Sequence, residues 1–185
     1  MKNEFFADYF ALIKKQIESI KHEDLISAVE RIKTVSKAGN KLIIAGNGGS
    51  AAMASHVSVD FTKVAGVRAI NFNEADLITC FANDYGYEKV FEKAIEFYGD
   101  AGDLLILISS SGSSENVVNA AQLANELDIS VITFTGFKND NPLRNLGDIN
   151  FWVDCKSYNI VEMTHHIWLL SIVDYIVGKT EYPAS

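Results

Sequence analysis

Hydrophobic residues at three- and four-residue spacing run through residues 3–38, which is the pattern of amphipathic helices. The polar segment 22–24 divides this pattern into two stripes, and Asp24 is a suitable cap for the second helix. We therefore predict two antiparallel helices ahead of the first strand. The first stripe is Phe6, Phe10, Ile13, Ile17 and Ile20, and the second is Leu25, Val29, Ile32 and Val35.

From residue 41 onwards the pattern changes to short apolar runs that are followed by small or polar residues. Runs of this kind are typical of strands that are buried on both faces of a sheet. Helical periodicity fills the intervals, so strand and helix alternate, which predicts an α/β fold with a parallel sheet between helices. The predicted strands are 41–45, 68–72, 103–108, 129–134 and 149–153, and the predicted helices are 50–63, 86–98, 115–127 and 159–177.

The length of 185 residues suits a single domain over 1–185, with helices in 1–38 and a parallel α/β core in 39–178. The chain is 48% hydrophobic and 22% charged, which are ordinary values for a globular protein. Its net charge is −8 and its pI is about 4.9. Because duplex binding needs a basic face, we expect no direct contact with nucleic acid and none with an anionic membrane surface.

The N-terminal sequence differs from a signal peptide, because acidic residues stand where a basic and then an apolar segment would be needed. No uninterrupted apolar run reaches the roughly 18 residues that predict a membrane span. Cys80 and Cys155 are far apart, lack zinc spacing and fall in or beside apolar runs, so we predict two buried free thiols. Together these observations predict a cytoplasmic protein.

Two predicted strand ends carry small polar residues in the pattern of ligand-binding loops. The sequence at 46–50 is Gly-Asn-Gly-Gly-Ser, and the sequence at 109–114 is Ser-Ser-Ser-Gly-Ser-Ser; each leads directly into a predicted helix. Ligands of open parallel sheets bind at this edge, and serine hydroxyls beside helix-start amides favour a phosphate. The first loop lacks the Lys-Ser/Thr ending of a P-loop and the Rossmann glycine spacing, so we do not expect ATP or NAD.

Taken together, these segments resemble the sugar isomerase (SIS) domain family and, within it, the phosphoheptose isomerase branch. The resemblance implies a flavodoxin-like sheet of five parallel strands in three layers. It also implies a homotetramer, assembled through the N-terminal helices, with sites at subunit interfaces. The segments that carry the resemblance are Gly46–Ala52, His56, Phe81–Gly86, Ile108–Ser114 and Thr133–Gly136, within a similarity that extends to about Gly178.

The resemblance also implies which residues bind a phosphorylated sugar. The serine loop would hold the phosphate, while the first loop, its helix and the segment near residue 83 would line the sugar. The implied phosphate ligands are Ser109, Ser110, Ser111 and Ser114, and the implied sugar contacts are Asn47, Gly48, Gly49, Ser50, His56, Asn83 and Asp84.

One departure from the branch lies on the helix that follows the first loop. Members of the branch carry a His and, four residues later, a Glu, where this chain has His56 and Asp60. The spacing places both side chains on one face of the helix. The resemblance implies a zinc site here, with His56 and Asp60 as the retained ligands and with Glu162 and either His165 or His166 completing the set of N and O ligands.

A second departure lies on the C-terminal helix, where the branch has a Gln and, eight residues later, a His. An ungapped match places Val161 and Leu169 at these two positions. A match with one inserted residue places Glu162 and Leu170 there instead. In both matches the distal His of the branch is absent.

The same C-terminal helix carries Glu162, His165 and His166 on one face, at three- and four-residue spacing. An aldose–ketose isomerisation moves a proton between two carbons through an enediol, which needs a base and a group that shuttles hydroxyl protons. Candidate bases are Glu162 and Asp60, and candidate shuttles are His56, His165 and His166. The alternative role for these side chains is a polar helix face or an interface network.

Two functions are compatible with these residues. The first is a phosphosugar isomerase, acting on sedoheptulose 7-phosphate to give the heptose 7-phosphate of surface polysaccharides, or on a related phosphosugar. The second is a non-catalytic tetramer that binds a phosphosugar or a protein partner in a regulatory role. The acids and imidazoles around the predicted pocket favour the enzyme, because such groups are costly to bury without a use.

Overall fold

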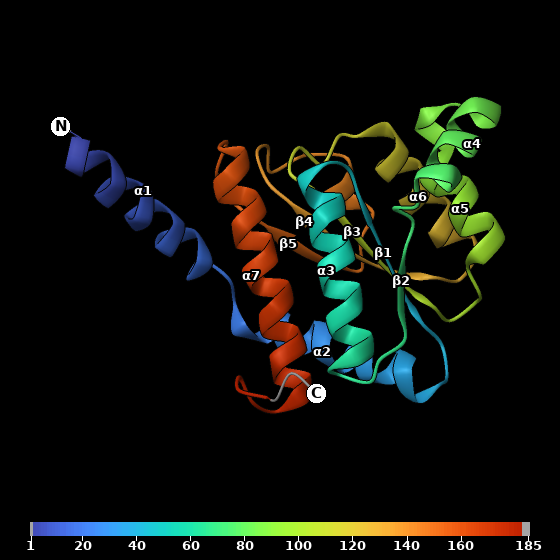
Figure 1. The fold of residues 1–185 in the computed structure, drawn as a ribbon, viewed down its shortest axis with the longest axis horizontal. Coiled ribbons are helices and arrows are strands. Elements are labelled where there is room, and N and C mark those ends of the chain that lie inside the picture. Colours follow the sequence, from blue (N-terminus) through green and yellow to red (C-terminus); the bar gives the residue numbers. More distant parts are fainter. Residues whose placement is uncertain (1, 183–185) are drawn as a thin grey trace.

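Five parallel strands form one sheet with helices on both faces in the computed structural model, which describes residues 2–182 (Figure 1). The strand order is β2-β1-β3-β4-β5, so the chain runs outwards from β1 to β2 and returns to β3 on the other side of β1. This order confirms the predicted flavodoxin-like fold. The strands are β1 Leu42–Gly46, β2 Ala69–Asn71, β3 Leu104–Ser109, β4 Ser130–Thr135 and β5 Ile149–Trp152.

The order in which strands are added to the sheet reverses between β1 and β3, which are parallel neighbours. Every residue of these two strands is buried, in keeping with their apolar sequences and with helices on both faces. Gly46 pairs with Ile108, so the loops after β1 and β3 emerge side by side. Open parallel sheets bind ligands at such a reversal point, outside the carboxyl ends of the strands.

Three helices cover the first face of the sheet. Their apolar side chains share one core with the strands, and Val29, Phe61 and Trp168 are buried in it. Two of these helices, α3 and α7, lie side by side (Figure 1) and bring residues far apart in sequence into one seam. The three helices are α2 His22–Lys37, α3 Gly49–Lys63 and α7 Tyr158–Val177.

The helix α7 is long and apolar enough, by length and composition, to cross a membrane. Its central residues nevertheless pack against the sheet, where Leu169, Ile172 and Val173 are buried in the core. Core helices of globular proteins have the same composition because they are covered along most of their length. We therefore assign α7 to the protein core.

The opposite face of the sheet is covered mainly by two helices, which form a second core with the strands. A further helix, α4, stands near the carboxyl edge of the sheet (Figure 1), and its apolar residues are no more than partly buried. The elements on this side are α4 Ala75–Tyr85, the single turn η1 Tyr87–Lys89, α5 Val90–Tyr98, α6 Glu115–Glu126 and the single turn η2 Leu143–Asn145.

The sequence pattern over 86–98 predicts one helix, whereas the structure has η1 followed by α5. It does not predict α4, although Leu77, Ile78, Phe81 and Ala82 recur at helical spacing and pack against the second core. Cys80 of α4 is exposed and Cys155 is partly buried, so the prediction of two buried thiols is wrong. Gly86 separates α4 from η1 with a φ of 90°, a conformation that glycine adopts without strain.

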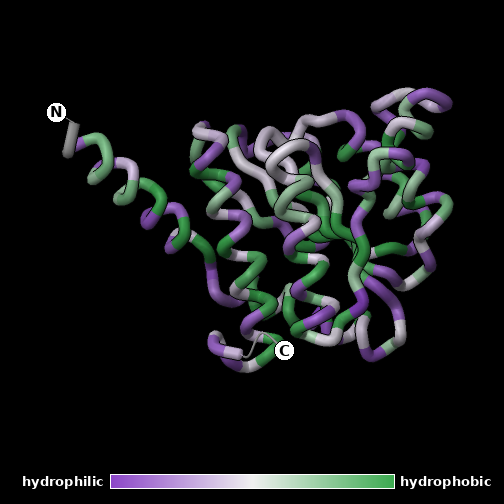
Figure 2. The backbone as a smooth tube through the Cα atoms, in the orientation of Figure 1, coloured by the Kyte–Doolittle hydropathy of each residue, from purple (hydrophilic) through white to green (hydrophobic). Residues whose placement is uncertain are grey.

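The first helix, α1 (Lys2–Ile17), extends away from the rest of the protein (Figure 1). Figure 2 shows hydrophobic positions along this projecting helix. Its end is fastened to α7, since the Trp168 indole N–H donates a 3.0 Å hydrogen bond to the Ile17 carbonyl. The predicted antiparallel packing of α1 on α2 is therefore wrong, because the apolar stripe of α2 is already buried in the core. Asp24 lies within the first turn of α2 and does not cap it; Lys21 holds the cap position.

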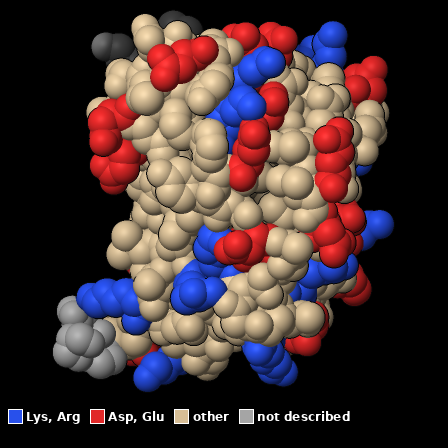
Figure 3. Space-filling view, turned by 90° about the vertical axis from the view of Figure 1, so that its right-hand side faces the viewer, with Lys and Arg blue, Asp and Glu red and all other residues tan. Residues whose placement is uncertain are grey.

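Charged side chains of both signs are interspersed on the face shown in Figure 3. On that face the basic residues lie among acidic ones and do not form a continuous patch. Duplex-binding domains, in contrast, gather Lys and Arg on one face.

Candidate functional site

The loop after β1 turns sharply into α3. Gly48 has a φ of +55°, which a side chain would strain, and α3 begins at the next residue. This turn leaves Asn47 half-buried at the carboxyl edge of the sheet and places Ser50 in a buried position in the first turn of α3.

The loop after β3 is shaped by Gly112, whose φ is +61°. A Cβ at Gly112 would collide with the buried side chain of Asn141, so this position has no room for one. The Gly112 amide donates to Ser109 Oγ at 3.2 Å, which curls the serine loop over the end of β3. Ser114 stands at the cap position of α6 without a capping hydrogen bond from its side chain, so its hydroxyl and the helix-start amides face the loop.

A cavity of about 110 Å³ lies between these two loops. Ser110 contributes a hydroxyl that is buried and has no hydrogen-bond partner among the described residues. A buried, unpartnered donor beside the start of α6 favours an anion there, because the helix start carries positive partial charge. The cavity is lined by Asn47, Ser50, Ile108, Ser109, Ser110, Ser111, Ser114, Tyr158 and Glu162.

Glu162 brings a carboxylate from α7 to the opposite wall of this cavity. The carboxylate lies against Gly49, where an added Cβ would stand 2.4 Å from Oε2. The absence of a side chain at Gly49 therefore makes room for Glu162. The cavity thus combines a predicted phosphate loop with one carboxylate at its rim.

A row of three side chains in polar contact lies further along the seam between α3 and α7. His166 Nε2 is 3.0 Å from His56 Nδ1, and His56 Nε2 is 3.3 Å from an Asp60 carboxylate oxygen. Burial lowers the pKa of His166 below its ordinary value, and the neighbouring His56 ring lowers it further, while Asp60 acts in the opposite direction. His166 stands one turn after Glu162, about 6 Å along the helix axis.

The zinc site implied by the family resemblance does not fit this row of side chains. Both ring nitrogens of His56 are already engaged, one by Asp60 and the other by His166. Within residues 2–182, no group of three or more His, Cys, Asp or Glu side chains is arranged to hold a metal ion. The three side chains therefore pair with one another rather than forming the cage of N and O ligands that zinc requires.

Residues 4–136 match the SIS domain family, which is the family indicated by the two loops. This chain belongs to the SIS domain family. It is 34% identical over 191 residues to a phosphoheptose isomerase of Aliarcobacter butzleri, covering 98% of this chain and 100% of the relative. A phosphoheptose isomerase of Fusobacterium nucleatum is 32% identical over 171 residues, which cover 89% and 88% of the two chains.

Solved structures agree with these relatives. The phosphoheptose isomerase GmhA from Neisseria gonorrhoeae superposes with a TM-score of 0.85 at 30% identity, covering 95% of this chain and 98% of that one. A phosphoheptose isomerase from Francisella tularensis gives a TM-score of 0.86 at 24% identity, covering 97% of this chain and 100% of that one. This SIS domain thus has the fold of that branch along nearly its whole length.

Apart from His165, the structure separates the predicted site residues of this SIS domain into three groups. Those from the two loops, together with Glu162, line the cavity between the loops or the one that adjoins it, except Gly49, which lies against Glu162. His56, Asp60 and His166 lie together in the α3–α7 seam. Asn83 and Asp84 are exposed on α4, where they contact each other and do not line the cavity between the loops.

His165 does not reach the cavity, contrary to its prediction as a catalytic candidate. Its side chain is fully buried, and Nε2 lies 2.9 Å from the Thr135 carbonyl. Because a carbonyl accepts, Nε2 carries the proton and Nδ1 is left without a partner. Burial lowers the pKa of His165 to about 4, so it is a neutral core residue at neutral pH.

We predict that His165 makes the protein sensitive to acid. The unfolded chain regains an ordinary pKa near 6.5, so between pH 6.5 and pH 4 the unfolded state binds the extra proton and the free energy of unfolding falls as the pH falls. The loss between pH 7 and pH 5 is about 2 kcal/mol. Urea unfolding at the two pH values should show this loss, and His165→Gln, which keeps a donor for Thr135, should reduce it; an equal loss in both proteins would contradict the prediction.

Sequence reasoning missed several residues that line the cavities at this edge, among them Tyr158, Tyr87 and Asn116. Tyr158 borders the cavity between the loops, and Tyr87 and Asn116 border an adjoining cavity of about 80 Å³ that shares Asn47. Each follows a segment that the sequence singles out: Tyr158 begins α7, Tyr87 follows the Gly86 turn, and Asn116 is the second residue after the serine loop. Their positions depend on how the segments meet in space.

Proposed function

We propose that this SIS domain protein is a phosphosugar isomerase that interconverts a ketose phosphate and an aldose phosphate. The observation that carries the proposal is the single cavity that the serine loop and Glu162 line together. The names of the related phosphoheptose isomerases point to sedoheptulose 7-phosphate and heptose 7-phosphate as the first pair to test.

The phosphate is bound by the serine loop. Ser110, Ser111 and Ser114 supply hydroxyl donors, and the first amides of α6 supply N–H donors at the positive end of the helix. This arrangement binds an anion although the chain as a whole carries a net charge of −8. At about 110 Å³ the cavity is smaller than the roughly 300 Å³ of small-molecule sites, so it holds the phosphate end while the sugar extends along the α3–α7 seam.

Glu162 acts as the base of the proposed reaction. It takes a proton from the carbon next to the carbonyl, which gives an enediol, and returns the proton to the neighbouring carbon. The hydroxyl proton must move in the same sense, from the oxygen on the first of these carbons to the oxygen on the second. His166 and His56 serve this transfer with Asp60 as their anionic partner, because the lowered pKa of His166 leaves its ring neutral and able to accept a proton.

The burial of side chains on α7 indicates which of its residues stand at the positions of the family Gln and distal His. Val161 and Leu169 are both fully buried in the core, so neither position can face a substrate. Glu162 and Leu170 are partly exposed on the neighbouring strip of the helix. We therefore place Glu162 at the position of the family Gln and Leu170 at that of the distal His, so the altered catalytic set is Asp60, Glu162 and Leu170.

The proposal is tested by incubating the protein with a panel of ketose and aldose phosphates that includes sedoheptulose 7-phosphate. The expected result is enzyme-dependent appearance of the paired isomer, resolved by anion-exchange chromatography. Thermal stabilisation by a sugar phosphate without conversion would instead favour the regulatory, non-catalytic alternative. A cytoplasmic location remains a prediction that fits a soluble enzyme of sugar phosphates.

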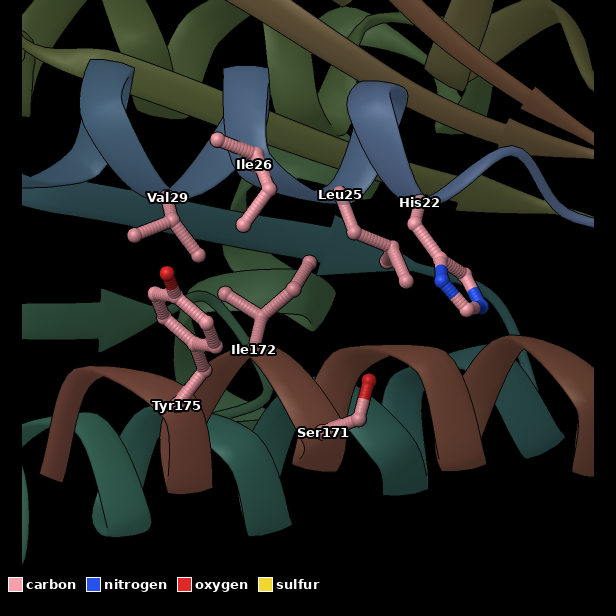
Figure 4. A pocket seen from close by; sticks show the side chains of 7 residues that line it. All are labelled: His22, Leu25, Ile26, Val29, Ser171, Ile172 and Tyr175. Atoms are coloured by element: carbon pink, nitrogen blue, oxygen red, sulfur yellow. The ribbon is translucent and has the colours of Figure 1, made fainter. Parts of the chain in front are cut away.

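We also propose that the protein is a homo-oligomer assembled through α1 and the neighbouring helices. Phe5, Phe6 and Phe10 are 60–64% exposed on α1, which is costly for aromatic side chains of an isolated chain. A second apolar surface is the cavity of about 290 Å³ between α2 and α7, where Leu25, Ile172 and Tyr175 are directed toward one another (Figure 4). A tetramer, as the family resemblance implies, would cover such surfaces.

The oligomer is tested by replacing Phe6 and Phe10 with Glu. The expected result is a shift from an assembled species to a 20.4 kDa monomer in light scattering, because charges at both positions prevent burial of the stripe. Lys15→Glu, on the same helix, is the control for charge alone. A monomeric parent protein would contradict the proposal.

A further inference from the structure

The side-chain amide of Asn47 is held from two directions. Asn47 Nδ2 donates to Asn116 Oδ1 at 2.9 Å, and Asn116 Nδ2 donates back to Asn47 Oδ1 at 2.9 Å. The phenol of Tyr87 donates to the same Asn47 Oδ1 at 2.9 Å. Asn47 is thus joined to α6 through Asn116 and to η1 through Tyr87.

These three hydrogen bonds determine which end of the Asn47 amide is available to a ligand. A side-chain amide has a carbonyl oxygen with two lone pairs and an NH₂ group with two donors. The oxygen accepts from Tyr87 and Asn116, so both of its lone pairs are occupied. One donor goes to Asn116, and no described residue accepts the other. Because Asn47 lines the cavity between the loops, the group left for a ligand is an N–H.

We propose that Tyr87 and Asn116 are positioning residues that hold Asn47 so that its amide N–H meets a substrate oxygen. This proposal rests on the proposed isomerase function, and it identifies the group that stabilises negative charge during that reaction. In an aldose–ketose isomerisation, negative charge develops on the carbonyl oxygen when the neighbouring carbon loses its proton. A fixed N–H donor stabilises that charge, whereas a carbonyl oxygen in the same place would repel it.

Both positioning residues stand on segments that the fold holds firmly. Asn116 is 3% exposed in the first turn of α6, directly after the serine loop. Tyr87 begins η1, whose Glu88 carbonyl accepts a 3.0 Å hydrogen bond from Asn119 of α6. The single helix α6 therefore orders the phosphate loop, Asn116 and the segment that carries Tyr87. Asn47 is in this way aligned with the phosphate site.

The proposal is tested with Tyr87→Phe, which removes one hydroxyl and keeps the ring. Tyr87 is 55% exposed, so the variant should fold normally. We expect kcat for the isomerised sugar phosphate to fall about ten-fold, the effect of one lost neutral hydrogen bond. KM and the affinity for inorganic phosphate, which probes the serine loop alone, should stay unchanged. Tyr85→Phe, two residues earlier on α4, is the matched control and should leave kcat unchanged.

A double-mutant cycle with Asn47→Ala shows whether Tyr87 acts through Asn47. If it does, Tyr87→Phe should have no further effect on kcat in the Asn47→Ala background. The same cycle is run on the affinity for a sugar-phosphate hydroxamate, an analogue of the enediolate, by calorimetry. An equal effect of Tyr87→Phe in both backgrounds, or a loss of phosphate affinity, would overturn the proposal.

The cycle also separates this proposal from the proposed function. A parent protein that neither isomerises any sugar phosphate nor binds the hydroxamate overturns the isomerase itself, and the positioning role with it. A parent protein that does both, with additive effects of Tyr87→Phe and Asn47→Ala, leaves the isomerase standing and overturns the positioning role alone.

Discussion

Replacing Glu162 with Gln is expected to lower kcat for isomerisation by about 10³-fold, within the range that a general base contributes. Gln has the shape of Glu and still fits beside Gly49, but it cannot accept a proton at neutral pH. The affinity for inorganic phosphate should not fall, because the serine loop is untouched and the variant removes a negative charge from the cavity that the loop lines. Steady-state kinetics and calorimetry on the same preparation measure both quantities.

A second variant tests the position of the Glu162 carboxylate rather than its charge. Gly49→Ala places a methyl group where the carboxylate lies, 2.4 Å from Oε2. Gly49 is the first residue of α3 and its φ is not in the positive range, so alanine should not weaken the helix. We expect lower kcat with an unchanged or raised melting temperature. Full activity in both Glu162→Gln and Gly49→Ala would remove Glu162 from the reaction.

Replacing Ser111 and Ser114 together with Ala is expected to weaken sugar-phosphate binding by about 10³-fold. Each hydroxyl gives a hydrogen bond to a charged phosphate, worth about 1.5–3 kcal/mol. Both side chains are partly exposed at the cavity, and neither is part of the core, so the fold should stay intact. Calorimetric titration with inorganic phosphate and with sedoheptulose 7-phosphate measures the loss.

The matched control for the serine loop is Ser113→Ala. Ser113 belongs to the same loop but is exposed and does not line the cavity, and its hydroxyl donates to the Ser111 carbonyl. The Ser113→Ala variant should bind sugar phosphate with an affinity within about two-fold of that of the parent protein. Equal affinity of the double variant and the parent would show that the phosphate binds elsewhere.

The fold can be predicted from the sequence because its strands are short apolar runs that end in small polar residues. All five strands lie within two residues of their predicted positions, and the two ligand loops follow from glycine and serine at the ends of β1 and β3. The prediction omits the helix α4, although its apolar residues recur at helical spacing and pack against the second core.

The candidate site is only partly readable from sequence, because spacing along a helix does not say which face the sheet covers. Glu162, His165 and His166 are neighbours on α7, yet His165 is fully buried while Glu162 reaches the cavity. Three residues separate Glu162 from His165, so their side chains stand only about 60° apart around the helix. Tyr87 and Asn116 meet Asn47 only because η1 and α6 come together in the fold.

The central claim is that this cavity binds a sugar phosphate and moves a proton between its first two carbons. Proton NMR in D2O with sedoheptulose 7-phosphate tests it most directly, because an enediol formed in solvent-accessible surroundings exchanges its carbon-bound proton. We expect loss of the C1 proton signal and appearance of an aldose signal with the parent protein, and neither change with Glu162→Gln. An unchanged spectrum under conditions where calorimetry shows the ligand bound would contradict the claim.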